Sequence, residues 1–134
     1  MLFVYGSLMS RTELERVLGH PYAGDYRPHA LLGYRREWQV SDGEMAYLGL
    51  RKDAASSISG FLISLTEADL KKLDDWEPGY NRVPIENFQV YMSTVEQQRR
   101  SESFVLRSYL NMVQQVAPEP LPKVPPHMTI VEDD

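Results

Sequence analysis

Residues Leu65–Arg82 read LTEADLKKLDDWEPGYNR, and they predict one helix with a defined beginning and a defined end. Thr66 is a residue type that caps helix N-termini, and Asp69, three residues later, is the acidic member of a capping-box-like pair. Pro78 and Gly79 stop the helix, because proline disfavours helical geometry in the residue before it and glycine readily ends helices. The segment therefore predicts a helix that ends close to residue 77.

The apolar stripe of this helix leads to a carboxylate. Leu70 and Leu73 are three residues apart on the face that is expected to be buried, and Glu77 continues that face four residues later. Burial would raise the pKa of the Glu77 carboxyl, and the helix dipole disfavours negative charge at this end. The placement lowers stability, which a functional role would explain. The structural alternative is a partly exposed carboxylate bonded to Tyr80 or Arg82.

A second junction between strand and helix lies at the N-terminus. Met1–Tyr5 is a short apolar, β-favouring run that predicts a buried strand. Ser10 and Glu13 form a capping box, which predicts a helix that ends at Gly19. Between them, Gly6–Leu8 would leave several backbone N–H groups close together, and such a cluster favours an anion or oxyanion site. Many turns of this kind contain Gly and Ser for backbone geometry alone.

Most of the remaining chain reads as strands. After the first helix we expect consecutive strands, with a hairpin turn at Asp42-Gly43 and a polar loop at Arg51–Ser57. Two extended segments follow the central helix, and Pro84 in the first of them indicates an edge or a bend. Phe104–Leu110 reads as a returning strand, although Tyr109–Val116 fits the start of a helix equally well.

These elements predict an α+β fold. About six or seven strands that follow one another in sequence favour a mostly antiparallel sheet, and such a sheet tends to curl into a small β-barrel with flanking α-helices. Residues 1–116 are expected to form this domain. Residues 117–134 form a proline-rich C-terminal tail, with five prolines between Ala117 and Pro126. We expect the tail to be loosely attached, because proline has no backbone N–H to donate.

Composition argues against several classes of function. The 134 residues carry a formal net charge of −5, whereas a nucleic-acid surface needs a clustered basic face. The absence of cysteine excludes disulfides, thiolate nucleophiles and cysteine-ligated metals. The apolar opening is too short for a signal peptide, and no apolar run reaches transmembrane length. A cytoplasmic protein that contacts neither nucleic acid nor membrane is the default expectation.

Three kinds of catalytic site are to be weighed. A serine hydrolase would activate Ser7 with a histidine, but Ser7 is not in a Gly-x-Ser-x-Gly turn and the three histidines of the chain are scattered. The same scatter gives no metal-ligand spacing. The third possibility is a single carboxylate base, Glu77, that faces the Gly6–Leu8 loop. It needs no metal, cofactor or covalent intermediate, which agrees with the absence of cysteine and of any metal-ligand spacing among the histidines.

Two motifs together resemble the γ-glutamylcyclotransferase-like family. The first is Tyr5-Gly6-Ser7-Leu8 directly after the N-terminal strand. The second runs from Gly60 to Val83 and comprises a strand with a leading glycine, a helix that ends in Leu73-Asp-Asp-Trp-Glu77, and Tyr80-Asn-Arg82 before the next strand. The order of elements matches from the first residue to Tyr109. The tryptophan that follows the loop in the glutathione-specific branch is Met9 here, which argues against that branch.

The resemblance implies an activity and a site. It implies a small β-barrel on which a γ-glutamyl amino acid or amine cyclises to 5-oxoproline and releases its amine, without metal or cofactor. Glu77 is the implied general acid and base, and the loop Tyr5–Leu8 is implied to hold the γ-glutamyl group. Tyr5 and Tyr109 would wall the site, or serve as core aromatics.

Arg82 has two interpretations, because it would pair either with the substrate or, as a structural residue, with Asp74 or Asp75. The site as a whole also has two interpretations. A non-catalytic module on the same fold, which binds small amino-acid-like ligands without turning them over, would need the same loop. The leaving group and the oligomeric state stay open at this level.

Overall fold

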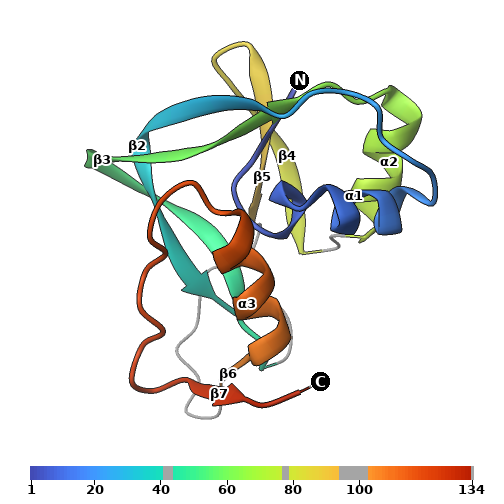
Figure 1. Ribbon diagram of the computed structural model, residues 1–134. Coiled ribbons are helices and arrows are strands. Elements are labelled where there is room, and N and C mark those ends of the chain that lie inside the picture. Colours follow the sequence, from blue (N-terminus) through green and yellow to red (C-terminus); the bar gives the residue numbers. More distant parts are fainter. Residues whose placement is uncertain (41–43, 77–78, 94–102, 134) are drawn as a thin grey trace.

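The structure is a computed structural model that describes residues 1–40, 44–76, 79–93 and 103–133, and Figure 1 shows its arrangement. The elements in chain order are β1 (Leu2–Val4), a 3-10 turn η1 (Ser7–Met9), α1 (Arg11–Leu18), β2 (Arg27–Gln39), β3 (Tyr47–Ile63), α2 (Glu67–Trp76), β4 (Tyr80–Ile85), β5 (Phe88–Ser93), β6 (Phe104–Leu106), α3 (Arg107–Val116) and β7 (Thr129–Val131). In this part of the chain, no helix combines the length and apolar character needed to cross a bilayer.

The short strand β1 is the centre of a five-stranded sheet with the order β2-β3-β1-β5-β4. Leu2 pairs with Ile63 of β3 in the antiparallel direction and with Gln89 of β5 in the parallel direction. The pairs β2–β3 and β4–β5 are antiparallel. The predicted α+β class and the mostly antiparallel sheet are therefore confirmed.

The predicted closure of this sheet into a β-barrel is wrong. Within the described residues, β2 and β4 are the two edges of the sheet and do not pair with each other. Pro84 lies in β4 opposite Gln89 of β5, and it has no N–H to offer to a further strand. The sheet stays open on this side, and the edge position predicted for Pro84 is confirmed.

Strand β3 is continuous where the sequence predicts two strands and a loop. Arg51–Ser57 belongs to β3 and extends the hairpin with β2, while the predicted turn at residues 42–43 lies outside the described residues. The pairing register shifts between Leu32 and Tyr34 of β2. Gly33 between them has φ 84°, a left-handed conformation that glycine adopts without strain. Polar residues exposed on an extended hairpin arm resemble a loop in sequence, which explains the error.

Helices α1 and α2 lie side by side next to the central strand (Figure 1). Both predicted N-terminal caps are confirmed. The backbone N–H of Glu13 donates to Ser10 Oγ at 3.2 Å, and that of Asp69 donates to Thr66 Oγ1 at 3.1 Å. Gly19 ends α1 with φ 79°, in the left-handed conformation expected at this position.

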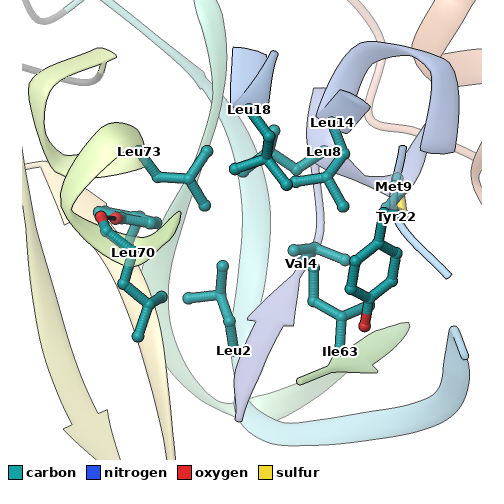
Figure 2. Packing of buried hydrophobic residues seen from close by; sticks show 11 residues of the cluster. Leu2, Val4, Leu8, Met9, Leu14, Leu18, Tyr22, Ile63, Leu70 and Leu73 are labelled. Carbon is teal, nitrogen blue, oxygen red and sulfur yellow. Dashed lines mark hydrogen bonds between the residues drawn. The ribbon is translucent and has the colours of Figure 1, made fainter. Parts of the chain in front are cut away.

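The two helices and the sheet share one hydrophobic core, shown in Figure 2. Leu70 and Leu73 of α2 point toward Leu2 of β1, which confirms the buried stripe of the central helix. Leu2 and Leu73 are fully buried. Removing a leucine side chain from such a core typically costs about 2–5 kcal/mol, so this cluster fixes α2 against the sheet.

The C-terminal third differs from two expectations. The segment predicted as a strand over Phe104–Leu110 divides into β6 and the first turn of α3, so the helical alternative is correct.

The expectation of a loosely attached tail is wrong. Trp38 Nε1 donates to the carbonyl oxygen of Pro122 at 3.0 Å, and β7 pairs in parallel with β6. Proline carbonyls still accept hydrogen bonds. The apolar residues Leu121 and Val124, which lie between the prolines, pack against the buried cluster that contains Leu110 and Val113 of α3. The boundary proposed at residue 116 stays a prediction.

Candidate functional site

A pocket of about 660 Å³ opens where β1 ends. The loop after β1, the N-terminal end of β3, the junction of α2 and β4, and helix α3 all contribute to its wall. Its lining includes Tyr5, Gly6, Ser7, Leu8, Met45, Tyr47, Leu48, Trp76, Gly79, Tyr80, Tyr109 and Met112. Five residues expected from the sequence at the site, Tyr5 to Leu8 and Tyr109, are thus brought together although about a hundred positions separate them in the chain.

The loop Gly6–Leu8 has its carbonyl groups occupied and its N–H groups available. The N–H groups of Met9 and Ser10 donate to the carbonyl oxygens of Gly6 and Ser7, each at 3.0 Å. The hydroxyl of Tyr26 donates to Leu8 O at 2.8 Å, and burial raises the pKa of this hydroxyl, so it remains a donor. Across the described residues, the N–H groups of Gly6, Ser7 and Leu8 donate to no protein group. The loop can therefore offer backbone donors to a ligand.

The two aromatic residues expected at the site are both fixed in the core and exposed to the pocket. The Tyr5 hydroxyl donates to the carbonyl oxygen of Tyr91 at 2.7 Å. The Tyr109 hydroxyl accepts from the N–H of Leu48 at 3.2 Å, and its ring packs edge-on against Trp38 and Tyr47. Both tyrosines therefore line the pocket and pack within the hydrophobic core, while their contact with a ligand stays a prediction.

Arg82 is not among the pocket-lining residues. Its guanidinium makes a two-point contact with Asp74 of α2, with Nε–Oδ1 at 2.8 Å and Nη2–Oδ2 at 3.0 Å, and it also contacts Gln89 and Glu67. This is the structural ion pair that the sequence offered as an alternative to a substrate contact. It ties the end of α2 to the adjacent strands.

Asp74 remains ionised in this arrangement. Its partial burial opposes ionisation, but the hydrogen bonds from the Tyr91 hydroxyl and from Arg82, together with the charge of Arg82, outweigh it. The pKa of Asp74 therefore lies below its usual value. The Tyr91 hydroxyl donates to Asp74 at 2.6 Å, so the pocket-lining Tyr91 is held by the same ion pair.

Glu77, the central residue of the sequence prediction, lies outside the described residues. Helix α2 is described as far as Trp76, and the chain is described again from Gly79. Both of these residues line the pocket.

Several pocket residues were not predicted from the sequence. Trp76 and Tyr47 are large aromatic side chains, each 36% exposed, and Met45 and Met112 add flexible apolar surface. Trp76 stands directly before Glu77, so the central motif already contained a signal for it. Tyr47 and Met45 carried no local signal, because only the long β2–β3 hairpin and its contact with α3 bring them to the loop after β1.

The serine-hydrolase and metal possibilities both depend on where the histidines lie. None of the three histidines, which are all described, lines the pocket that contains Ser7. His20 bonds Asp69 at 2.9 Å and His29 packs against Phe3 and Phe88. No group of three or more His, Asp and Glu side chains in the described ranges is arranged to hold a metal ion.

The fold and site define a small α+β protein with a ligand-sized pocket that borders a Tyr-Gly-Ser-Leu loop. The chain belongs to the family described as gamma-glutamyl cyclotransferase, AIG2-like, whose model matches residues 2–117. This confirms the resemblance inferred from the two motifs. No curated protein sequence is significantly similar to the chain.

Solved structures share the fold at low sequence identity. A protein named gamma-glutamyl cyclotransferase superimposes with a TM-score of 0.63 and 13% identity, over 85% of this chain and 75% of that one. An uncharacterised protein from Homo sapiens gives a TM-score of 0.61 at 14% identity, over 84% and 74% of the two chains. A protein from Arabidopsis thaliana gives 0.55 at 23% identity, over 69% and 67%. At these identities the likeness establishes the fold.

Proposed function

We propose that this protein is a γ-glutamyl cyclotransferase that converts a γ-glutamyl amino acid or amine into 5-oxoproline and the free amine, with Glu77 as general acid and base. One observation carries the proposal. The family's Tyr5–Leu8 loop borders a pocket whose wall also contains Trp76 and Gly79, which precede and follow Glu77 in the sequence. The proposed base is therefore encoded between two residues of the same pocket.

The substrate itself supplies the nucleophile for this reaction. Its α-amine attacks the γ-carbonyl carbon, a C–N bond forms to close a five-membered lactam, and the bond to the leaving amine breaks. Holding the two groups in the reactive geometry can be worth an effective molarity of about 10⁵ M or more. No nucleophilic side chain is then needed, in agreement with the absence of cysteine and of a histidine beside Ser7.

The residues of the pocket would handle protons and charge. An α-amine has a pKa of about 8 and must lose a proton before it attacks, so a carboxylate base such as Glu77 would accept that proton. The protonated carboxyl would then return it to the departing amine. The attacking nitrogen would lose its second proton to water as it becomes the lactam N–H, and the departing amine would take up a proton from water as an ammonium, which leaves the enzyme unchanged. The N–H groups of Gly6–Leu8 would bind the developing oxyanion or the substrate carboxylate.

The remaining predicted site residues receive different roles in this proposal. Tyr5 and Tyr109 shape the pocket, because each hydroxyl is hydrogen-bonded to backbone and both residues line the cavity. Arg82 supports the site from outside by fixing the C-terminal half of α2 through Asp74. This role needs no contact between Arg82 and the substrate.

The direct test is the release of 5-oxoproline from a panel of γ-glutamyl amino acids and γ-glutamyl amines by the purified protein. We expect turnover of at least one member, and the preferred member identifies the leaving group. If the protein binds panel compounds in calorimetry but releases no 5-oxoproline, the non-catalytic binding module is correct. If it neither binds nor cleaves any of them, both functions are excluded.

A further inference from the structure

One buried cation lies directly behind the pocket loop. The Arg36 side chain of β2 is only 3% exposed, and burying a charge is costly unless the charge is paired and hydrogen-bonded. Its guanidinium satisfies both conditions. Nε donates to Tyr5 O at 2.9 Å, Nη2 donates to Ser59 O at 2.6 Å, and Nη1 donates to Glu119 Oε1 at 2.8 Å. One side chain thus joins β2, β3, the loop after β1 and the C-terminal tail.

The anionic partner comes from the tail. Glu119 lies two residues beyond the segment that matches the family model, in the stretch that leaves α3 and crosses the long hairpin (Figure 1). Its Oε1 atom also accepts a hydrogen bond from the N–H of Ser59. The carboxylate is therefore fixed by two donors, and it neutralises the guanidinium that holds Tyr5 O.

The contact at Tyr5 O determines the direction of a pocket N–H group. The described backbone contains no cis peptide, and in a planar trans peptide the C=O and N–H bonds point in opposite directions. Because Tyr5 O points at Arg36, the N–H of Gly6 points away from Arg36. Gly6 itself lines the pocket, whereas neither Arg36 nor Glu119 does.

We propose that Arg36 and Glu119 act as positioning residues that hold the Tyr5–Gly6 peptide, so that the Gly6 N–H is presented to the ligand in one fixed orientation. The catalytic consequence rests on the proposed cyclotransferase function, while the orientation of the peptide does not. The tail beyond the family match then completes the site from behind. Loss of the pair should reduce kcat more than it changes KM, because a misdirected donor weakens the transition state most.

The test compares two tail glutamates that each pair with an arginine. Glu119→Gln removes the charge beside the buried Arg36. Glu132→Gln removes an equal charge beside Arg107, a pair whose side chains are 38% and 72% exposed, at 3.1 Å. We expect Glu119→Gln to lower kcat by about 10- to 100-fold at little change in KM, as misplacement of a reacting group does, and Glu132→Gln to stay within about twofold.

A second readout is independent of turnover. The amide resonance of Gly6 in a ¹⁵N–¹H NMR spectrum should shift in Glu119→Gln and not in Glu132→Gln. If the wild type releases no 5-oxoproline, the proposed function fails, and the Gly6 resonance alone decides the positioning role.

Arg36→Lys provides the test if Glu119→Gln does not fold. A lysine keeps the positive charge beside Glu119, but one ammonium cannot reproduce the fork that reaches Tyr5, Ser59 and Glu119 together. The same shift of the Gly6 resonance is expected. An unchanged Gly6 resonance with unchanged kcat in a folded variant of either residue would overturn the proposal, even if its melting temperature fell.

Discussion

At the scale of single residues, the role of a charged side chain near the pocket can be judged from the groups that it contacts. Arg82 was one structural partner considered for Glu77, but its guanidinium contacts Asp74, Gln89 and Glu67. The Arg82–Asp74 pair joins the C-terminal half of α2 to β4. We expect this junction to persist when Glu77 is substituted.

We expect Glu77→Gln to abolish turnover while leaving the fold intact. Glutamine keeps the shape and the hydrogen-bonding capacity of glutamate but cannot accept the α-amine proton, and loss of a positioned base lowers kcat by about 10²–10⁴-fold. Removing a negative charge next to the C-terminal end of α2 should raise the free energy of unfolding by about 0.3–1 kcal/mol. The measurements are 5-oxoproline release and a melting curve on the purified variant.

Glu67→Gln is the matched control on the same helix. Glu67 lies in the first turn of α2, where the helix dipole favours negative charge, and its side chain is 71% exposed. We expect unchanged turnover and a slightly lower melting temperature. Glu77→Gln, by contrast, is expected to lose turnover and to melt at a slightly higher temperature. Full activity of Glu77→Gln would end the catalytic role of Glu77, whereas loss of activity with a lower melting temperature would indicate a structural one.

At the scale of elements, one side-chain pair connects the two helices that carry the core. His20 follows the C-terminal cap of α1, and its Nε2 lies 2.9 Å from Oδ1 of Asp69 in the first turn of α2. The hydrogen bond with Asp69, aided by one with the carbonyl of Pro21, raises the pKa of His20 above its ordinary value. The protonated imidazolium is thus favoured by folding.

This pair predicts a defined pH dependence of stability. A raised pKa in the folded state stabilises the protein fully below the unfolded value of about 6.5, and the contribution disappears as the pH rises through the folded value. The free energy of unfolding of the wild type should therefore exceed that of His20→Asn at pH 5.5, and the difference should shrink at pH 8 and above. Urea unfolding at several pH values measures it. A difference that grows with pH would show that the pair does not act in this way.

The elements also show what the sequence could and could not establish. Caps and the Leu70–Leu73 stripe are local patterns, so their interpretation needed no partner and was confirmed. The extent of β3 through Arg51–Ser57 depends on pairing with β2, which the local sequence does not encode. Closure of the sheet depends on whether the outer strands β2 and β4 meet, and only the tertiary structure decides this. At the site, the loop Tyr5–Leu8 was recognisable from its motif, whereas Tyr47 reaches the pocket only through tertiary packing.

At the scale of the whole molecule, the proline-rich tail closes one side of the structure. Its apolar residues pack against the cluster formed by the end of the long hairpin and α3, and they comprise Leu121, Val124, Met128 and Ile130. Trp38 bonds the tail through Pro122, and Arg36 bonds it through Glu119. A polyproline composition thus does not prevent packing, because the contacts use side chains and carbonyl oxygens, which proline-rich segments retain.

A chain that ends at Ala117 should therefore be markedly less stable than the full chain. It loses the acceptor of the Trp38 indole, the apolar contacts of the tail, and the carboxylate beside the buried Arg36. Breaking a buried ion pair by removing one partner costs about 3–5 kcal/mol, discounted here because the Glu119 side chain is 32% exposed. With the other contacts included, we expect a loss of roughly 3 kcal/mol and a fall in melting temperature of about 10 °C.

A shorter truncation separates the parts of the tail. A chain that ends at Met128 lacks β7 but keeps Glu119 and Pro122, so it retains the contacts to Arg36 and Trp38. Because β7 is only three residues long and mostly exposed, we expect this chain to melt within a few degrees of the full protein. Scanning calorimetry of the three proteins measures both steps. If the chain that ends at Ala117 melts at the temperature of the full chain, the tail contributes no stability and its contacts with Arg36 and Trp38 are incidental.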